Sequence, residues 1–214
     1  MIARRVRGIV FDLDGTLIDG YDGIAAGVNA ARAAFGLPAM SVADVRGRVG
    51  AGLSHLMADV VGAERATEGA AIFRRAYDRA CVTGTRAVPR LLETLDGLDA
   101  RGYAMSVASN KPAAYSERIL EGLDARRYFA AVEGPETAGA LKPDPAMIRA
   151  CLLAMEIDGA EAVYVGDMAI DVEAADRAGV GVILIAGGST PADELAATGR
   201  RTLPDLAALL EVLT

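Results

Sequence analysis

The sequence is poor in the residues that small metal-bound or disulfide-bonded proteins depend on. Its 214 residues contain two cysteines, one histidine and no tryptophan. Cys81 and Cys151 lie far apart, outside any CxxC motif, so we expect two small buried hydrophobic residues in a reducing compartment. A chain of this length buries roughly 70% of its unfolded surface, so its core needs neither disulfides nor a structural metal.

Long apolar runs and an excess of basic charge are also missing. The apolar run 8–11 ends at Asp12 and is too short for a signal peptide, and the run 180–186 is too short to cross a bilayer. The net charge is −7, whereas proteins that bind nucleic acid or anionic lipid usually carry a basic surface. We therefore expect a cytoplasmic protein, a monomer or small homo-oligomer, that binds neither nucleic acid nor membrane.

Short apolar runs alternate with longer stretches of helical periodicity over most of the chain. The apolar runs predict buried strands at 6–11, 103–108, 162–165 and 180–185. The periodic stretches predict helices at 112–123, 145–155, 172–178 and 204–213. This alternation predicts an α/β fold, namely a doubly wound, Rossmann-like core around a parallel sheet.

Residues 17–86 interrupt the alternation. This segment shows no convincing strand, only helical patterns at 21–35, 53–61 and 66–80. It predicts an all-helical cap domain, inserted directly after the first strand. The flanking segments 1–16 and 87–214 then form one discontinuous α/β catalytic core.

Polar residues follow the predicted strands, at the edge where open parallel sheets bind their ligands. In chain order these residues are Asp12, Asp14, Ser109, Asn110, Asp167 and Asp171, and Lys142 lies in the connection before the strand 162–165. Four carboxylates at one sheet edge repel each other unless a cation joins them. Oxygen ligands without a nearby His or Cys favour a hard ion, so the set predicts a Mg²⁺ site.

Lysine is scarce in this chain. Of 22 basic residues only Lys111 and Lys142 are lysine, and each directly precedes a proline. Lys111 lies shortly after the predicted strand 103–108, and Lys142 lies in the connection before the predicted strand 162–165. A compact ammonium fits beside both a carboxylate and a phosphoryl group, whereas a guanidinium imposes its own fork geometry. We expect this role for Lys142, and we interpret Lys111 as a solvated surface lysine.

Four motifs appear in the order found in the haloacid dehalogenase superfamily, which the chain resembles. They are Asp-x-Asp-Gly-Thr at 12–16, Ser-Asn-Lys-Pro at 109–112, Lys-Pro-Asp-Pro at 142–145 and Gly-Asp-x-x-x-Asp at 166–171. The helical insertion resembles the small cap of phosphoglycolate phosphatase-like members. The resemblance implies a phosphatase acting on a small phosphorylated metabolite, with 2-phosphoglycolate as the leading candidate.

The same resemblance implies a role for each matching acid. Asp12 is the nucleophile that becomes an aspartyl phosphate, and Asp14 is the general acid and base. Mg²⁺ is held by the carboxylates of Asp12 and Asp167 and by the backbone carbonyl of Asp14.

The remaining core positions are implied to bind the phosphoryl group or to support the site. Ser109 and the backbone amide of Asn110 bind phosphoryl oxygens, while Lys142 neutralises their charge. Asp171 orients Lys142 or a metal-bound water, and Thr16 supports the metal-binding loop.

The cap has one glycine-rich basic stretch, at 46–52, directly before the predicted helix 53–61. Two interpretations stay open: a flexible connection between helices, or a loop in which Arg46 and Arg48 bind a second anion such as a substrate carboxylate. We expect His55, the single histidine, to be a partly buried surface residue.

Other functions remain as alternatives. A sugar phosphomutase would use the same aspartyl phosphate, and a non-catalytic phosphate-binding module could keep the fold. A dehalogenase is disfavoured because dehalogenases of this superfamily lack an acid at the position of Asp14. A phosphonate hydrolase with a cap lysine is disfavoured because residues 17–86 contain no lysine.

Overall fold

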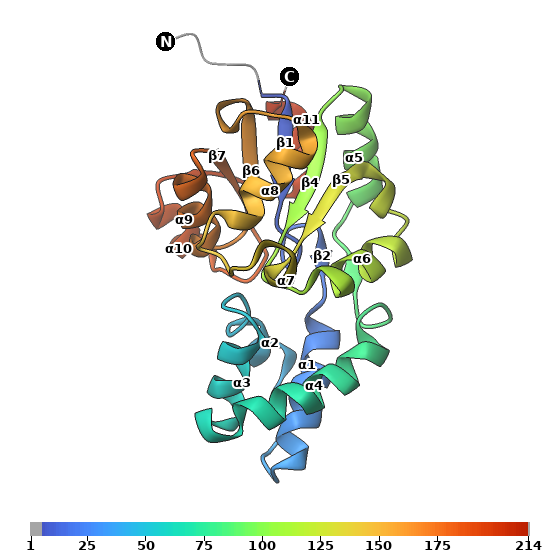
Figure 1. The fold of residues 1–214 in the computed structure, drawn as a ribbon, viewed down its shortest axis with the longest axis vertical. Coiled ribbons are helices and arrows are strands. Elements are labelled where there is room, and N and C mark those ends of the chain that lie inside the picture. Colours follow the sequence, from blue (N-terminus) through green and yellow to red (C-terminus); the bar gives the residue numbers. More distant parts are fainter. Residues whose placement is uncertain (1–5, 214) are drawn as a thin grey trace.

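A six-stranded parallel sheet lies at the centre of the protein in a computed structural model that describes residues 6–213 (Figure 1). Its strands are β1 (Gly8–Phe11), β4 (Ala104–Ala108), β5 (Phe129–Glu133), β6 (Ala162–Gly166), β7 (Gly181–Ile185) and β8 (Arg201–Leu203). They are ordered β5-β4-β1-β6-β7-β8, and every neighbouring pair is parallel. The sheet therefore has the doubly wound, Rossmann-like order that the alternation predicts.

Helices cover both faces of the sheet because successive side chains of a strand point to opposite sides. Ile9 and Phe11 point into one core, and Val10 points into the other. The first core is packed by α5 (Leu91–Ala100), α6 (Ala113–Gly122) and α11 (Leu209–Val212). The second is packed by α8 (Ala146–Met155) and α9 (Ala169–Ala178), while α7 (Pro135–Ala138) and α10 (Ala192–Ala197) are short connections.

A group of helices is inserted between β2 (Ile18–Asp19) and β3 (Arg86–Ala87), and we refer to it as the cap. It consists of α1 (Tyr21–Ala34), α2 (Val42–Arg46), α3 (Leu53–Val61) and α4 (Ala66–Ala80), which lie together beyond one end of the sheet (Figure 1). Helices α1 and α4 pack closely because Gly27 of α1 faces Phe73 of α4. A Cβ at Gly27 would lie 2.7 Å from the Phe73 ring.

The two short strands β2 and β3 pair antiparallel where the chain enters and leaves the cap. The prediction that residues 17–86 contain no strand is wrong at these two points, because two residues are too few to show a period. Beside them, a Cβ at Gly84 would lie 2.7 Å from the backbone of Gly23. The two crossings therefore lie side by side, directly after β1.

Several other elements differ from the sequence prediction. Strands β5 and β8 were not predicted, since both are sheet edges with half-exposed, weakly patterned side chains. Helix α5 was also missed. The predicted helix 204–213 is a 3₁₀ turn at 206–208 followed by α11, and helix α9 starts at Ala169 rather than at residue 172.

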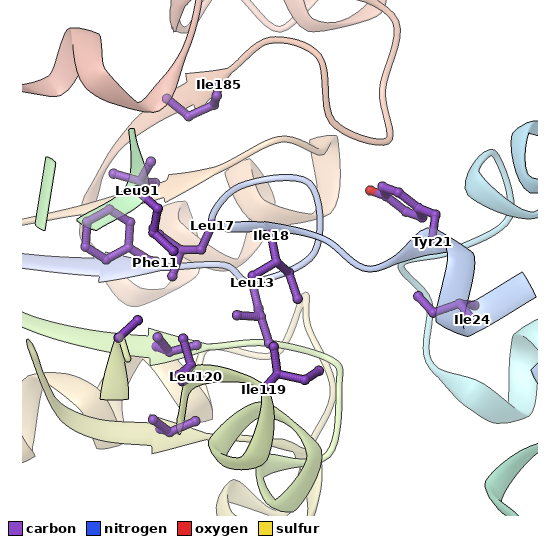
Figure 2. Close-up of a cluster of buried hydrophobic side chains, with 14 of the residues drawn as sticks. Phe11, Leu13, Leu17, Ile18, Tyr21, Ile24, Leu91, Ile119, Leu120 and Ile185 are labelled. Atoms are coloured by element: carbon purple, nitrogen blue, oxygen red, sulfur yellow. The ribbon is translucent and has the colours of Figure 1, made fainter. Parts of the chain in front are cut away.

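The buried core continues from the sheet into the segment that carries the cap. Leu13, Leu17 and Ile18 belong to the same buried cluster as helix α6, and the cluster extends to Tyr21 and Ile24 at the start of α1 (Figure 2). Cys81 and Cys151 are free and buried, as expected. No helix in the described part of the chain is long and apolar enough to cross a membrane.

Candidate active site

The carboxyl ends of β1, β4 and β6 are neighbours in the sheet and bring Asp12, Ser109 and Asp167 to one edge. Strands β4 and β5 lie on one side of β1 and strands β6 to β8 on the other, and open α/β sheets bind ligands at such a change of direction. The turn after Asp12 requires glycine at position 15. Gly15 has φ +86°, and a Cβ there would lie 2.4 Å from Asp167 Oδ2.

Lys142 joins two of the predicted acids. Its Nζ donates to Asp12 Oδ1 at 2.8 Å, to Asp171 Oδ1 at 2.7 Å and to the Tyr164 hydroxyl at 3.1 Å, so all three ammonium protons are used. Burial works to lower the pKa of Lys142, but attraction to Asp12 and Asp171 raises it well above its usual value. Asn110 fixes the backbone of Lys142, because the Asn110 Oδ1 accepts a hydrogen bond from the backbone N–H of Lys142 at 2.7 Å.

Asp12, Asp167 and Asp171 form a buried cluster in which one oxygen of each lies within 4.8 Å of the others. Burial, then repulsion by Asp12 and Asp171, raises the pKa of Asp167 to about 8. Three carboxylates face the single ammonium of Lys142, so two negative charges remain when all are ionised. This excess and the oxygen-only donor set fit a hard divalent cation such as Mg²⁺.

Within the cluster, Asp171 has the most internal partners. Its Oδ2 accepts the backbone N–H groups of Asp167 and Met168 at 3.0 Å, and its Oδ1 accepts from Lys142. This geometry suits the expected role of orienting Lys142. Asp12 and Asp167 are then the better placed carboxylates for a metal ion.

Asp167 is held by two neighbours from other segments. The Thr16 hydroxyl donates to its Oδ1 at 3.3 Å, which matches the supporting role expected for Thr16. The backbone N–H of Ser189 donates to its Oδ2 at 2.5 Å. A Cβ at Gly188 would lie 2.2 Å from the same oxygen, so this turn after β7 closes tightly over the carboxylate.

Lys111 is not a solvated lysine, and that interpretation is wrong. Its side chain is 7% exposed, and its Nζ lies 2.9 Å from Asp14 Oδ2 and 2.7 Å from the Tyr77 hydroxyl of α4. The sequence could not show this, because the loop after β4 becomes buried only when the cap lies over it. Lys111 thus connects a catalytic-type acid of the core to the cap.

Asp14 has an unusual balance of contacts. Burial raises its pKa, while Lys111 opposes this effect. Among the described residues its Oδ1 has no hydrogen-bond partner, although it is fully buried. A carboxyl group with a raised pKa and one unpaired oxygen is well suited to carry a proton to or from a reacting group.

A cavity that is partly open to solvent lies between the core edge and the cap. Its core end is formed by most of the predicted site residues, namely Asp12, Asp14, Ser109, Asn110 and Lys142, together with Lys111 and Ser189. The cap closes the other end. The structure therefore brings the acids, the phosphoryl-binding candidates and both lysines to one site.

Arg46 and Arg48 are not among the residues that line this cavity. Arg46 pairs with Asp19 at 3.2 Å, and Arg48 pairs with Asp59 at 2.9 Å. The expectation that they bind a second substrate anion therefore finds no support in this arrangement, in which each guanidinium already has a carboxylate partner.

The glycine-rich stretch reaches the site through the Gly50 backbone and the uncharged side chain of Val49 instead. Asn110 Nδ2 donates to the Gly50 carbonyl oxygen at 2.7 Å, which ties the cap to the loop after β4. His55 is exposed at the start of α3 rather than partly buried as expected, and it lines a second hollow beside Arg48. This stretch connects the cap to the core rather than presenting charge to the cavity.

Sequence reasoning missed three residues of the site. Tyr164 lies in a predicted apolar strand, and every residue of this strand is buried. A buried hydroxyl needs a hydrogen-bond partner, and the Tyr164 hydroxyl donates to the Ala108 carbonyl oxygen at 2.7 Å. Tyr77 carried no signal, and the Gly-Gly-Ser-Thr sequence around Ser189 indicated no more than a turn, because the contacts of these residues with Lys111 and Asp167 join segments far apart in the chain.

Comparisons with known proteins agree with this geometry. A family model described as haloacid dehalogenase-like hydrolase matches residues 9–185. Phosphoglycolate phosphatase 1 of Pseudomonas aeruginosa is 33% identical over 186 residues, which are 83% of this chain and 68% of that protein. The phosphoglycolate phosphatase of Aquifex aeolicus is 33% identical over 174 residues, covering 81% of this chain and 82% of that one.

Solved structures share the whole fold. A crystal structure described as a predicted phosphoglycolate phosphatase from Haemophilus somnus aligns with a TM-score of 0.86 and 26% identity over 98% of both chains. A haloacid dehalogenase-like family protein from Streptococcus pneumoniae aligns with a TM-score of 0.89 and 21% identity, over 98% of this chain and 99% of that one. The second likeness concerns the fold alone.

Proposed function

Because the chain belongs to the haloacid dehalogenase-like hydrolase family, we propose that it is a Mg²⁺-dependent phosphatase that forms an aspartyl phosphate on Asp12. The observation that carries this proposal is the buried ammonium of Lys142, which lies 2.8 Å from Asp12 at the edge of a three-carboxylate cluster. The cytoplasmic location belongs to the same proposal. The family and its phosphatase relatives support the general class, which is a phosphoric monoester hydrolase.

The first chemical step transfers the phosphoryl group to the enzyme. A carboxylate oxygen of Asp12 attacks phosphorus in line, a new P–O bond forms, and the ester P–O bond breaks. Asp14 gives its proton to the departing alcohol oxygen, for which its raised pKa is suitable. The products are an alcohol and an aspartyl phosphate.

The second step regenerates the enzyme. Asp14, now ionised, takes a proton from water, whose oxygen attacks phosphorus. The P–O bond to Asp12 breaks, and inorganic phosphate leaves. The same residue thus serves as acid in one step and as base in the next.

Other residues hold the phosphoryl group during both steps. The Ser109 hydroxyl and the backbone N–H of Asn110 lie at the cavity floor and would donate to its oxygens, while Lys142 balances their charge. Asp12, Asp167 and the Asp14 carbonyl would hold the metal ion. When bound, Mg²⁺ supplies further positive charge to the phosphoryl oxygens.

The division of the chain follows from this arrangement. We assign residues 1–16 and 87–214 to the catalytic core and 17–86 to the cap, since the β2–β3 pair lies at both crossings. The core recognises a phosphate ester, and the cap covers its alcohol part. The names of the curated relatives make 2-phosphoglycolate a first candidate substrate.

Metal removal tests the cation in this proposal. Treatment with a chelator should lower phosphate release from p-nitrophenyl phosphate by at least about 10²-fold, since the metal contributes several kcal/mol to charge stabilisation. Mg²⁺ should restore the rate, and calorimetry should detect Mg²⁺ binding that Asp167→Asn weakens. Full activity after verified metal removal would rule out the metal mechanism.

Lys142→Arg should not be a conservative change. We expect kcat to fall by roughly 10²-fold, because three short bonds in a 5% exposed site leave no room for a planar guanidinium. Arg149→Lys, on the exposed side of α8, is the matched control and should keep wild-type kcat. An unchanged kcat in Lys142→Arg, with a normal unfolding transition, would contradict the assignment.

A further inference from the structure

The cap contributes no charged side chain to the active-site cavity, within residues 6–213. Its side chains there are those of Ile24, Val49, Leu53, Leu56, Phe73 and Tyr77. The only polar atom in this set is the Tyr77 hydroxyl, which accepts a hydrogen bond from Lys111. The part of the cavity that receives the alcohol end of a substrate is therefore apolar.

The cations that line the cavity already have partners. Lys142 is bonded to Asp12 and Asp171, and Lys111 lies 2.9 Å from Asp14. Apart from the backbone at Gly50, Gly52 and the start of α3, a second anion on the substrate would meet apolar side chains, or it would take Lys111 away from Asp14. Both outcomes disfavour binding, because a desolvated charge needs a partner.

Aromatic rings form a continuous wall on one side of the cavity. Phe73 and Tyr77 of α4 stack with ring centroids 5.2 Å apart, and Tyr115 of α6 meets Tyr77 edge to face at 5.0 Å. Apolar pockets with a few polar groups at one end bind ligands of the same character. A ring or alkyl group attached to phosphate would meet this wall while the phosphate lies over Asp12.

We infer that this enzyme prefers phosphate monoesters of apolar alcohols over esters, such as 2-phosphoglycolate, that carry a second anion. The inference rests on the proposed phosphatase function and specifies its substrate class. Hydrophobic alkyl and arylalkyl phosphates should therefore be better substrates than 2-phosphoglycolate, which is the first candidate by relationship.

A series of substrates tests the inference with the wild-type enzyme in Mg²⁺. The specificity constant kcat/KM should rise roughly 3- to 4-fold for each methylene from ethyl to propyl to butyl phosphate. Benzyl phosphate should exceed 2-phosphoglycolate by at least about tenfold. A kcat/KM for 2-phosphoglycolate equal to or above that of benzyl phosphate would overturn the inference.

A substitution in the cavity wall tests the inference through the ratio of two specificity constants, one for each substrate. A general loss of structure lowers both constants alike and leaves this ratio unchanged. Leu53 is half-buried at the first position of α3 and lines the cavity, so Leu53→Lys would place a cation near the alcohol end. The ratio of kcat/KM for 2-phosphoglycolate to that for benzyl phosphate should rise by roughly tenfold. Leu153→Lys makes the same change at a site 81% exposed and should leave the ratio unchanged. An unchanged ratio in Leu53→Lys would count against the inference.

The failures of the two proposals are distinguishable. If 2-phosphoglycolate is hydrolysed and benzyl phosphate is not, the phosphatase function stands and the inference falls. If no ester is hydrolysed, the phosphatase function falls. Calorimetry with Asp12→Asn and Mg²⁺ then still decides the cavity's preference, since tighter binding of benzyl phosphate supports the inference and tighter binding of 2-phosphoglycolate refutes it.

Discussion

Asp12→Asn should lower kcat by about 10⁴- to 10⁶-fold for every phosphate ester, because it removes the nucleophile on which both chemical steps depend. The amide has nearly the same shape as the carboxylate but is a poor nucleophile. Acid quenching during turnover of a labelled ester should trap phosphate on the wild-type protein and none on the variant. Detection of a phosphoenzyme in Asp12→Asn would refute the assignment.

Stability measurements separate this loss from misfolding. Asp12→Asn removes one carboxylate partner of the buried Lys142, but Asp171 still pairs with this lysine and repulsion within the acidic cluster falls, so we expect only a small change in the free energy of unfolding. Asp176→Asn is the matched control, since Asp176 is half-exposed, pairs with Arg200 and lies outside the cavity. It should keep wild-type kcat.

The core of the fold was predictable because its strands are short and apolar on both faces. Runs such as 103–108 and 162–165 match β4 and β6 closely, and their ends mark the catalytic edge. The edge strands β5 and β8 were not predictable in the same way. Each has one neighbour in the sheet and half-exposed side chains, so its sequence pattern is weak.

The core part of the site was also predictable. In a parallel sheet the carboxyl ends of neighbouring strands lie together, so residues that follow strands must meet even when far apart in sequence. Asp12 follows β1 and Asp167 follows β6, and a carboxylate oxygen of each lies within 4.8 Å of the other. Lys142 lies 2.8 Å from Asp12 although it follows no predicted strand. The lysine argument found this residue because an ammonium suits that crowded place better than a guanidinium.

Contacts between cap and core could not be predicted. Nothing in the periodicity of residues 66–80 shows that Tyr77 faces Lys111, or that Arg46 faces Asp19 rather than the cavity. These contacts depend on how the cap lies against the core. The partners of Lys111 and of the two arginines are for this reason the points where structure and sequence reasoning differ most.

Asp14→Asn should cost roughly 10²- to 10⁴-fold in kcat with benzyl phosphate, the usual contribution of a general acid and base. With p-nitrophenyl phosphate the first step should change much less, because nitrophenolate leaves without a proton. The second step still needs Asp14 to activate water. Rapid mixing should therefore show a burst of about one nitrophenolate per active site, followed by slow turnover.

The burst distinguishes this chemical role from a structural one. Asp14→Asn also removes the partner of a buried cation, and breaking such a pair typically costs about 3–5 kcal/mol in the free energy of unfolding. Asp14→Asn combined with Lys111→Met removes both charges and should recover much of that stability while keeping the burst and the dependence on the leaving group. Equal losses with both esters and no burst would mean that Asp14 acts only through its pair with Lys111, as a tie between the core and the cap.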